Sequence, residues 1–329
     1  MTDSRLVNEQ LVEAGDLDEL VRHLDRLCRA ADWEGVTDLR DRCRAALERG
    51  RQLWPVASHA EYRLALEAPG PIAARVVLPG AGHLSLGPLT EVVAARHRWD
   101  ELADHLSDGP TRAITAHERV IRGEDLTADD RIDPRVIELP LTLEPWEPDY
   151  PLAEYFAHEA HFPPPPLPAR EAVQLDGPAE QLDDPGTQSA LAELTRAWAA
   201  ESNGRTAVVA VRGDACGAIA ALGPTRVRIA PLTPGQALAW MAWAAASGGA
   251  HGRRRGMARG RFDAWWALAW LGGVAEDWPL PPDELGAIAQ DLRWYAWDAW
   301  EPDTGWRFHL AVEDPLDGLA WAVAATDAA

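Results

Sequence analysis

Residues 234–271 read PGQALAWMAWAAASGGAHGRRRGMARGRFDAWWALAWL, and this stretch decides the fold. Two apolar segments rich in Ala and Trp flank a short loop of Gly and Arg, which predicts two buried helices with a loop between them. The loop, residues 247–261, contains five Arg and one His but no acidic residue. The whole chain has 31 basic and 52 acidic residues and a formal net charge of −21, so this positive loop is its most unusual local feature.

The length and composition of the chain are those of a globular protein with room for two domains. It has 329 residues, of which 47% are hydrophobic and 25% charged. The sequence contains no run of about 18 apolar residues, and its acidic beginning has no apolar signal segment, so we expect a soluble cytoplasmic protein. The cysteines are odd in number and scattered, which favours small buried thiols over disulfides or a metal site. They are Cys28, Cys43 and Cys216.

The residue types also exclude some chemistry. All basic residues are Arg, so neither Schiff-base formation nor a phosphate-binding lysine is available. The sequence shows no Walker motif, no glycine-rich dinucleotide motif after a strand and no serine nucleophile elbow. We therefore expect no cofactor, and we favour a protein that is not an enzyme. The acidic balance repels nucleic acid, whereas it suits solubility or a basic partner protein.

Residues 1–123 have apolar positions at helical spacing, which predicts an all-α N-terminal domain. Two phrases, ADWEGV at 31–36 and HRWDEL at 97–102, place an acid directly after a Trp and an aliphatic residue three positions after it. This pattern is similar to the opening of a tetratricopeptide-like helix, in which a Trp packs between paired helices. The resemblance implies stacked helical hairpins, and an irregular helical bundle is the alternative.

Residues 124–186 differ from the rest of the chain. They contain 16 acidic residues against three Arg, and 12 of the 26 prolines, including Pro163–Pro166. Proline denies backbone donors and disfavours helix in the residue before it, so we expect a linker or an extended strap. Its many apolar residues predict that part of it lies against a domain. The proline run is either a rigid spacer or a polyproline ligand.

Residues 187–329 predict a Trp-rich α+β domain. We expect a helix at 188–200 and, around the 234–271 helices, six strands at 206–212, 216–222, 225–231, 293–300, 305–312 and 319–325. Short turns between these strands require antiparallel pairing. The predicted fold class is therefore α+β: a helical-hairpin domain, a strap, and an antiparallel sheet with packed Trp-rich helices.

Tryptophan is concentrated at the C-terminal end, where 11 of the 16 lie between Trp240 and Trp321. In the predicted strand 293–300, Trp294 and Trp300 point to one face and Trp297 to the other. One face should meet the helices, and the other needs the N-terminal domain, the strap or another chain. We take these three as possible interaction aromatics, with a bulky core as the alternative.

The Arg-rich loop has three interpretations. It is a mobile surface turn, a contact for the acidic strap, or an anion-binding site, because Arg presents planar donors suited to carboxylate and phosphate. If the loop pairs with the strap, we expect exposed pairs that contribute at most about 1 kcal/mol each. The candidate ligand-binding residues are Arg253, Arg254, Arg255, Arg259 and Arg261.

The sequence HEAH at 158–161 resembles a zinc-protease motif only superficially. The two histidines are three residues apart instead of four, and Pro163–Pro166 follow at once. We therefore expect no metal at His158 and His161. With no catalytic constellation in view, we expect a protein-interaction or adaptor protein. The alternative is a ligand-binding regulator or enzyme that uses the Arg-rich loop at 251–261.

Overall fold

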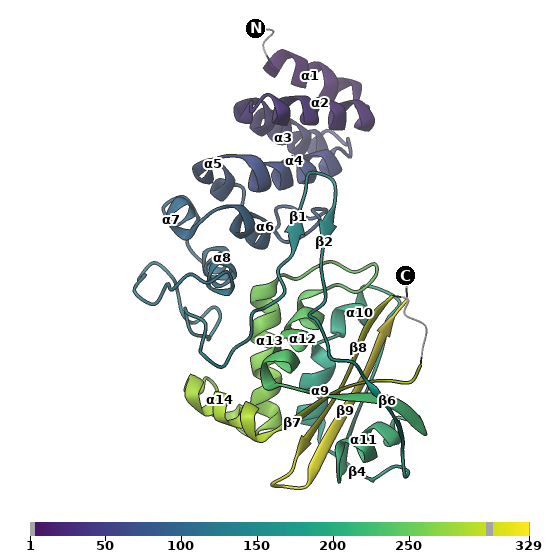
Figure 1. Cartoon of the computed structure of the whole chain (residues 1–329). Coiled ribbons are helices and arrows are strands. Elements are labelled where there is room, and N and C mark those ends of the chain that lie inside the picture. Colours follow the sequence, from purple (N-terminus) through teal and green to yellow (C-terminus); the bar gives the residue numbers. More distant parts are fainter. Residues whose placement is uncertain (1–3, 301–304, 329) are drawn as a thin grey trace. The chain divides into compact units, whose positions relative to one another are not determined.

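The computed structural model describes residues 4–300 and 305–328. It is an α+β structure that forms two compact units (Figure 1). The N-terminal unit comprises Met1–Val136 and Ala153–His161, and the C-terminal unit comprises Ile137–Leu152 and Phe162–Ala329. Both units thus include part of the acidic, proline-rich segment. In the described part of the chain, every helix is too short or too polar to cross a membrane.

The N-terminal unit is helical, as predicted, and carries one small β-hairpin. Helix α3 packs on both α1 and α4, α4 on α6, and α6 on α8, so the helices form successive layers. Trp33 and Trp99 each begin a helix, but the helix that starts at Trp99 is a single turn. The elements are α1 (Ser4–Ala14), α2 (Leu17–Arg29), α3 (Trp33–Glu48), α4 (Trp54–Glu67), α5 (Gly70–Arg75), α6 (Leu89–Arg96), α7 (Trp99–Leu102), α8 (Pro110–Ile121), β1 (Glu154–Tyr155) and β2 (Ala160–His161).

A buried amide joins the first three helices. Asn8 is fully enclosed, and its Nδ2 donates to the Gly35 carbonyl at 2.9 Å and to Asp38 Oδ2 at 2.8 Å. Its Oδ1 lies 2.8 Å from His23 Nε2, which donates to it. Because each hydrogen-bonding group of Asn8 is satisfied, the polar side chain can be buried at little cost and sets the register of these helices.

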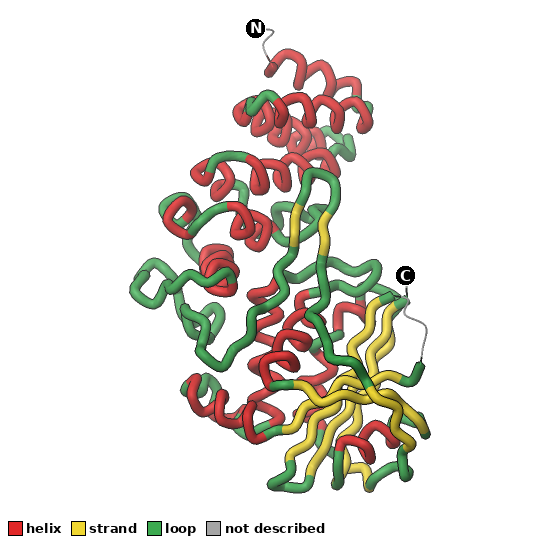
Figure 2. The backbone as a smooth tube through the Cα atoms, in the orientation of Figure 1, coloured by secondary structure: helices red, strands yellow, loops and turns green. Residues whose placement is uncertain are grey.

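The C-terminal unit is built on one antiparallel sheet with the strand order β3-β6-β7-β8-β9-β5-β4 (Figure 2). Two of its strands, β3 and β4, come from the acidic segment and form the edges. The strands are β3 (Glu171–Gln174), β4 (Glu180–Leu182), β5 (Arg205–Arg212), β6 (Arg226–Leu232), β7 (Arg293–Asp298), β8 (Trp306–Asp314) and β9 (Leu319–Asp327). The helices are α9 (Pro185–Glu193), α10 (Arg196–Ala200), α11 (Ala215–Ala221), α12 (Pro234–Ala246), α13 (Met257–Leu271), η1 (Ala275–Asp277) and α14 (Pro282–Asp291).

The predicted strand at 216–222 is wrong, because these residues form helix α11. The Asp214 side chain caps this helix by accepting the Gly217 N–H at 2.7 Å. The segment is rich in Ala, the strongest helix former. Its short length and apolar character are equally compatible with a strand, so periodicity alone did not distinguish the two.

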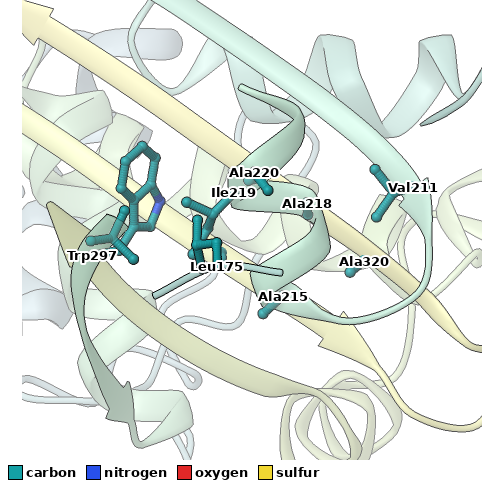
Figure 3. Close-up of a cluster of buried hydrophobic side chains, with 11 residues drawn as sticks. Leu175, Val211, Ala215, Ala218, Ile219, Ala220, Trp297 and Ala320 are labelled. Carbon is teal, nitrogen blue, oxygen red and sulfur yellow. The ribbon is translucent and has the colours of Figure 1, made fainter. Parts of the chain in front are cut away.

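Helix α11 covers the face of the sheet that carries Trp297 (Figure 3). Its Ala218 and Ile219 are buried in one cluster with Trp297. The strap contributes Leu175 to the same cluster. The second face of the sheet is therefore covered largely by α11, which the sequence had suggested was a strand. The strap supplies a smaller part through Leu175, as expected for a segment that lies against a domain.

The Trp-rich helices α12 and α13 form a close pair. A Cβ atom on Gly260 would lie 2.2 Å from the Ala242 carbonyl oxygen, so only glycine allows the two backbones to approach this far. The start of α12 has a capping box, in which Thr233 and Gln236 satisfy each other's backbone N–H groups. Trp240 of α12 packs edge-on against Phe308 of β8 at 5.1 Å and thereby connects the helix pair to the sheet.

Arg261 and Glu147 form a fully buried ion pair within the C-terminal unit. Both side chains have 0% exposure, and Arg261 Nη2 and Nε lie 2.6 and 2.7 Å from the two carboxylate oxygens of Glu147. Arg261 also donates to the carbonyls of Pro140 and Thr142, each at 3.0 Å. This contact confirms that the loop region meets the strap, but our expectation of an exposed pair is wrong here.

The Glu147 carboxylate is saturated by its surroundings. Besides Arg261, it accepts the indole N–H of Trp265 at 3.0 Å and the hydroxyl of Tyr150 at 2.6 Å. The backbone N–H of Glu144 donates to its other oxygen at 3.0 Å. Because two charges taken out of water are stabilised only when all their partners are present, this network ties the strap to α13 in one geometry.

We predict that Arg261→Met destabilises the C-terminal unit by about 3–5 kcal/mol, because it leaves the Glu147 charge buried without its partner. Urea unfolding followed by Trp fluorescence measures the change. The matched control is Arg253→Met, at an exposed position in the same loop, for which we expect a change within about 0.5 kcal/mol. Equal effects of the two substitutions would contradict a structural role for the buried pair.

Candidate functional site

The two central strands, β7 and β8, separate before either of them ends. Their pairing stops at Ala296↔Leu310, beyond which β7 continues along β6 and β8 along β9. The next residues in line are Trp297 and His309, whose rings stack 4.6 Å apart at 25°. Side chains therefore bridge the two halves of the sheet at this point, which we call the fork.

A pocket of about 360 Å³ lies at the fork. Its walls come from α12, from the separating parts of β7 and β8, and from the proline-rich segment before β3. The pocket therefore lies within the C-terminal unit and combines residues distant in sequence. The lining residues are Pro164, Pro165, Leu167, Arg170, Trp240, Trp243, Trp297, Asp298, Gly305, Arg307 and His309.

The aromatic wall of the pocket is held rigidly. Trp243 stacks on Trp306 at 4.9 Å, and Trp198 meets both rings edge-on at 6.2 Å. The indole N–H of Trp243 donates to the Phe162 carbonyl at 3.2 Å, and that of Trp198 donates to Ser247 Oγ at 2.7 Å. These contacts fix the direction of the Trp243 ring, so the wall exists before any ligand arrives.

Asp298 is the carboxylate of the pocket, and two arginines neutralise it. Arg228 Nε donates to Asp298 at 2.8 Å and Arg170 Nη1 at 3.3 Å. Burial alone would raise the pKa of Asp298, but the hydrogen bonds from Arg228 and the Trp300 backbone N–H, with the charge of Arg170, outweigh it and lower the pKa. Asp298 is therefore ionised at neutral pH and is better suited to position Arg170 than to accept a proton.

His309 is a buried, neutral imidazole. Burial lowers its pKa to about 4; the nearby charge of Arg307 adds to this, Asp298 opposes it and Arg170 adds a smaller contribution. At pH 7 the ring carries no charge and packs as an aromatic surface against Trp297. Among the described lining residues, the charged side chains are those of Arg170, Arg307 and Asp298.

Two donors at the pocket wall have no hydrogen-bond partner among the residues that the structure describes. They are Trp297 Nε1 and Arg170 Nε, both enclosed. A buried N–H without an acceptor costs about 1–3 kcal/mol, so such groups are uncommon in folded proteins. A ligand that brings acceptor oxygens to this wall would satisfy them after a small side-chain adjustment.

The Arg-rich loop is an ordered part of the C-terminal unit. The N–H groups of Ala250, His251 and Arg253 donate to Asp327, Ser202 and Glu201 at 2.6, 3.1 and 3.2 Å. The Gly248 and Gly252 backbones approach so closely that a Cβ atom on Gly248 would lie 2.2 Å from Gly252. This backbone pairing favours a defined loop over a mobile turn.

The five candidate anion-binding arginines do not converge on one point. Arg261 is enclosed in the network with Glu147, and Arg254 lies over the ring of Phe162 at 4.5 Å with 8% exposure. Arg255 and Arg259 both face Asp263 and Glu193, at distances from 2.8 to 4.0 Å. Of the five arginines, Arg253 is exposed to solvent, and the other four are buried or half-buried. An anion site formed by them stays a prediction.

The three tryptophans of strand β7 and the residues after it lie in different surroundings. Trp294 is a core residue whose indole N–H donates to the Ala289 carbonyl at 2.9 Å. Trp297 lines the pocket. Trp300 lies beyond the end of β7, is 42% exposed and has Arg226 over its ring at 4.7 Å. A shared role of the three as interaction aromatics stays a prediction. Trp297 and Trp300 are better placed for such a role than the buried Trp294.

The two histidines of HEAH lie in different surroundings of the N-terminal unit. His161 lies 3.9 Å from Glu154 and from Glu159. His158 lies instead beside Asp25 and His59. In the described part of the chain, one potential metal-ligand atom of each of these three residues lies within 4.8 Å of the other two. Burial lowers the pKa of His59 to about 4, and the charges of Arg63 and His158 add to the shift.

The fold is that of an α+β protein with a pocket at the fork of its sheet. The model of a family of unknown function, DUF6183, matches residues 18–329. Because this match spans nearly the whole chain, the protein belongs to DUF6183. No curated protein and no solved structure matches the chain.

Sequence reasoning missed most of the pocket. The three-residue spacing of Trp240 and Trp243 places them on one helical face, whereas Arg170, Arg307 and His309 belong to no motif. The alternation of β8 offered a weak signal, because it places Arg307 and His309 on one side of the strand and Phe308 and Leu310 on the other. Arg170 could not be found, since its place depends on the path of the proline-rich segment.

We predict that His309 makes the protein less stable in acid. In the unfolded chain this residue takes up a proton as the pH falls through about 6.5, whereas in the folded protein it does so only near 4. Stability is therefore full above pH 6.5 and falls by about 3 kcal/mol as the pH drops to 4.

His309→Gln should remove this part of the pH dependence. Urea unfolding at pH 7, 5.5 and 4 measures it, with His161→Gln as an exposed control that should follow the parent protein. A stability difference between His309→Gln and the parent that stays constant with pH would contradict the assignment.

Proposed function

We propose that this chain is a cytoplasmic protein-interaction or adaptor protein whose C-terminal pocket binds a carboxylate of a partner protein. One observation carries the proposal: two arginines, Arg170 and Arg307, share a pocket with the aromatic walls of Trp243 and Trp297. Guanidinium groups match the planar geometry of a carboxylate, and indole rings accept the apolar group that bears it.

The size and chemistry of the pocket favour binding over catalysis. A volume of about 360 Å³ is at the small end of ligand sites and suits one or two side chains or a chain end. Its described lining residues include no Ser, Thr, Cys or Tyr, so they offer no hydroxyl or thiol nucleophile, and the carboxylate of Asp298 is already paired with Arg170 and Arg228. Burial lowers the pKa of His309 to about 4, which makes it a weak general base at neutral pH.

The charge of the chain narrows the class of partner. A net charge of −21 attracts proteins with positive charge and repels acidic ones at long range. A basic partner that offers one carboxylate, at its C-terminus or on a side chain, satisfies both the long-range field and the pocket. The layered helices of the N-terminal unit give further surface for such a contact.

The second candidate is a ligand-binding regulator that takes a small aromatic carboxylic acid. We favour the fork pocket over the Arg-rich loop for this ligand, because Arg255, Arg259 and Arg261 already face carboxylates of the same chain. Both candidates use the same pocket chemistry, and they differ in the size of the molecule that carries the carboxylate.

We predict that 10 mM benzoate raises the melting temperature of the full chain by about 3 °C, as expected for a ligand with a dissociation constant near 1 mM. Benzamide, which has the same ring but no charge, should have no effect. Arg307→Gln should abolish the benzoate shift, whereas Arg253→Gln should keep it. Equal shifts with benzoate and benzamide would contradict carboxylate recognition.

The partner itself is tested by affinity capture with the full chain at low and high salt. Proteins that bind through the pocket should be captured by the parent and by Arg253→Gln, and at least tenfold less by Arg307→Gln. Identical capture by all three proteins would remove the pocket from the proposed function. A benzoate shift without pocket-dependent capture would favour the small-ligand candidate.

A further inference from the structure

The N-terminal unit brings together three metal-ligating side chains from distant parts of the chain. Asp25 lies on α2, His59 on α4, and His158 at the tip of the β1–β2 hairpin. One ligand atom from each lies within 4.8 Å of the other two. We propose that Asp25, His59 and His158 form a binding site for a divalent transition-metal ion of the Zn²⁺ type.

The spacing of the ligand atoms is close to what a metal requires. His158 Nε2 lies 3.3 Å from Asp25 Oδ1. Two ligands bound at about 2.0–2.2 Å in a tetrahedral site lie roughly 3.4 Å apart. The rings of His59 and His158 are 5.4 Å apart between centroids at 30°, so a small rotation of either brings their nitrogens to one ion.

His59 gives an independent reason to expect a ligand. Its Nε2 is enclosed and has no hydrogen-bond partner in the parts of the chain that the structure describes. Leaving a buried ring nitrogen without a partner is costly. A metal ion at the centre of the three side chains would satisfy this nitrogen, whereas a simple His158–Asp25 ion pair would leave it unsatisfied.

The hairpin that carries His158 is held in place by contacts outside the trio. Tyr155 donates its hydroxyl to Glu91 Oε2 at 2.6 Å, and Tyr62 donates to the Phe156 carbonyl at 2.5 Å. A Cβ atom on Gly87 would overlap the Tyr155 hydroxyl at 2.1 Å, so glycine is needed for this seat. His158 is thus positioned before any ion binds, which reduces the entropic cost of binding.

The surrounding charge also suits a cation. Arg63 contacts Asp25 Oδ1 at 2.5 Å and pairs with Glu67 at 2.6 and 3.1 Å. Two carboxylates against one guanidinium leave one negative charge beside the two imidazoles. Two nitrogen ligands with one carboxylate oxygen are a donor set that Zn²⁺, Co²⁺ and Ni²⁺ accept.

A bound ion would link the tip of the β1–β2 hairpin to helices α2 and α4. The ion would join residues that are about one hundred positions apart in the chain, and it would leave one coordination position for water. This proposal departs from our expectation from the sequence, which was no metal at His158 and His161 and no metal site elsewhere. In the proposed site His158 has other partners, and His161 is not a ligand.

The test is Zn²⁺ binding by the purified full chain without an affinity tag, measured by competition with a chromophoric chelator. We expect one Zn²⁺ per chain and a rise in melting temperature with Zn²⁺. Co²⁺ should give visible absorption bands of a site with fewer than six ligands. His158→Gln and His59→Gln should each weaken Zn²⁺ binding at least tenfold.

His161→Gln is the matched control, because it removes an imidazole from the same hairpin and should keep the parent affinity. His158 is 57% exposed on its side chain, so its replacement tests the site without disturbing the core. Either of two results would overturn the proposal: a parent protein that binds no Zn²⁺ with a dissociation constant below about 100 μM, or equal losses in His158→Gln and His161→Gln.

Discussion

The C-terminal unit depends on one buried electrostatic contact, the pair of Arg261 and Glu147. Two charges with 0% exposure are tolerated only because the guanidinium and the carboxylate share two hydrogen bonds and neighbouring groups occupy their remaining positions. The pair attaches residues 137–152 to α13, and α13 in turn packs closely on α12 through Gly260. Helix α12 supplies the aromatic wall of the pocket. The shape of the pocket therefore depends on the position of the strap, through the packing of α13 and α12. An acidic segment that looks like a linker in composition is therefore a structural part of this unit.

The pocket forms where the two halves of the sheet separate. Strand β7 follows β6 and strand β8 follows β9, so the two strands part after Ala296 and Leu310. Stacking of Trp297 on His309 closes the gap between them only partly. The proline-rich segment then crosses this region and adds Arg170, which Asp298 holds in place. A neutral histidine, two arginines and fixed indole rings line the pocket, and we propose that they recognise an anion and the apolar group attached to it.

The Arg-rich loop and the acidic segment both differ from what their compositions suggest. The loop looks like a ligand-binding surface and the segment like a linker, yet both are packed into the fold. The loop concentrates positive charge, yet Arg254, Arg255, Arg259 and Arg261 face carboxylates, carbonyls or an aromatic ring of the same chain. The acidic segment supplies one buried anion, two edge strands and a wall of the pocket. In the N-terminal unit, the same segment contributes the hairpin that carries His158 to Asp25 and His59. Membership of DUF6183 extends over these features, because the family match covers residues 18–329.

The sequence by itself determined the α+β class, the helical N-terminal unit and the buried helix pair at 234–271, because apolar periodicity and Gly or Pro punctuation are local properties. It also predicted correctly that the acidic segment packs on the fold, since Ile137, Leu139 and Tyr150 are too apolar to remain in water. Tertiary structure decided whether 216–222 became a strand or helix α11, because seven apolar residues fit both periods. Only the tertiary structure brought Arg170 to His309, Arg261 to Glu147, and His158 to His59. The physical reason is that ion pairs, pockets and ligand sets depend on distances between side chains far apart in the chain, and residue spacing along a sequence carries no record of those distances.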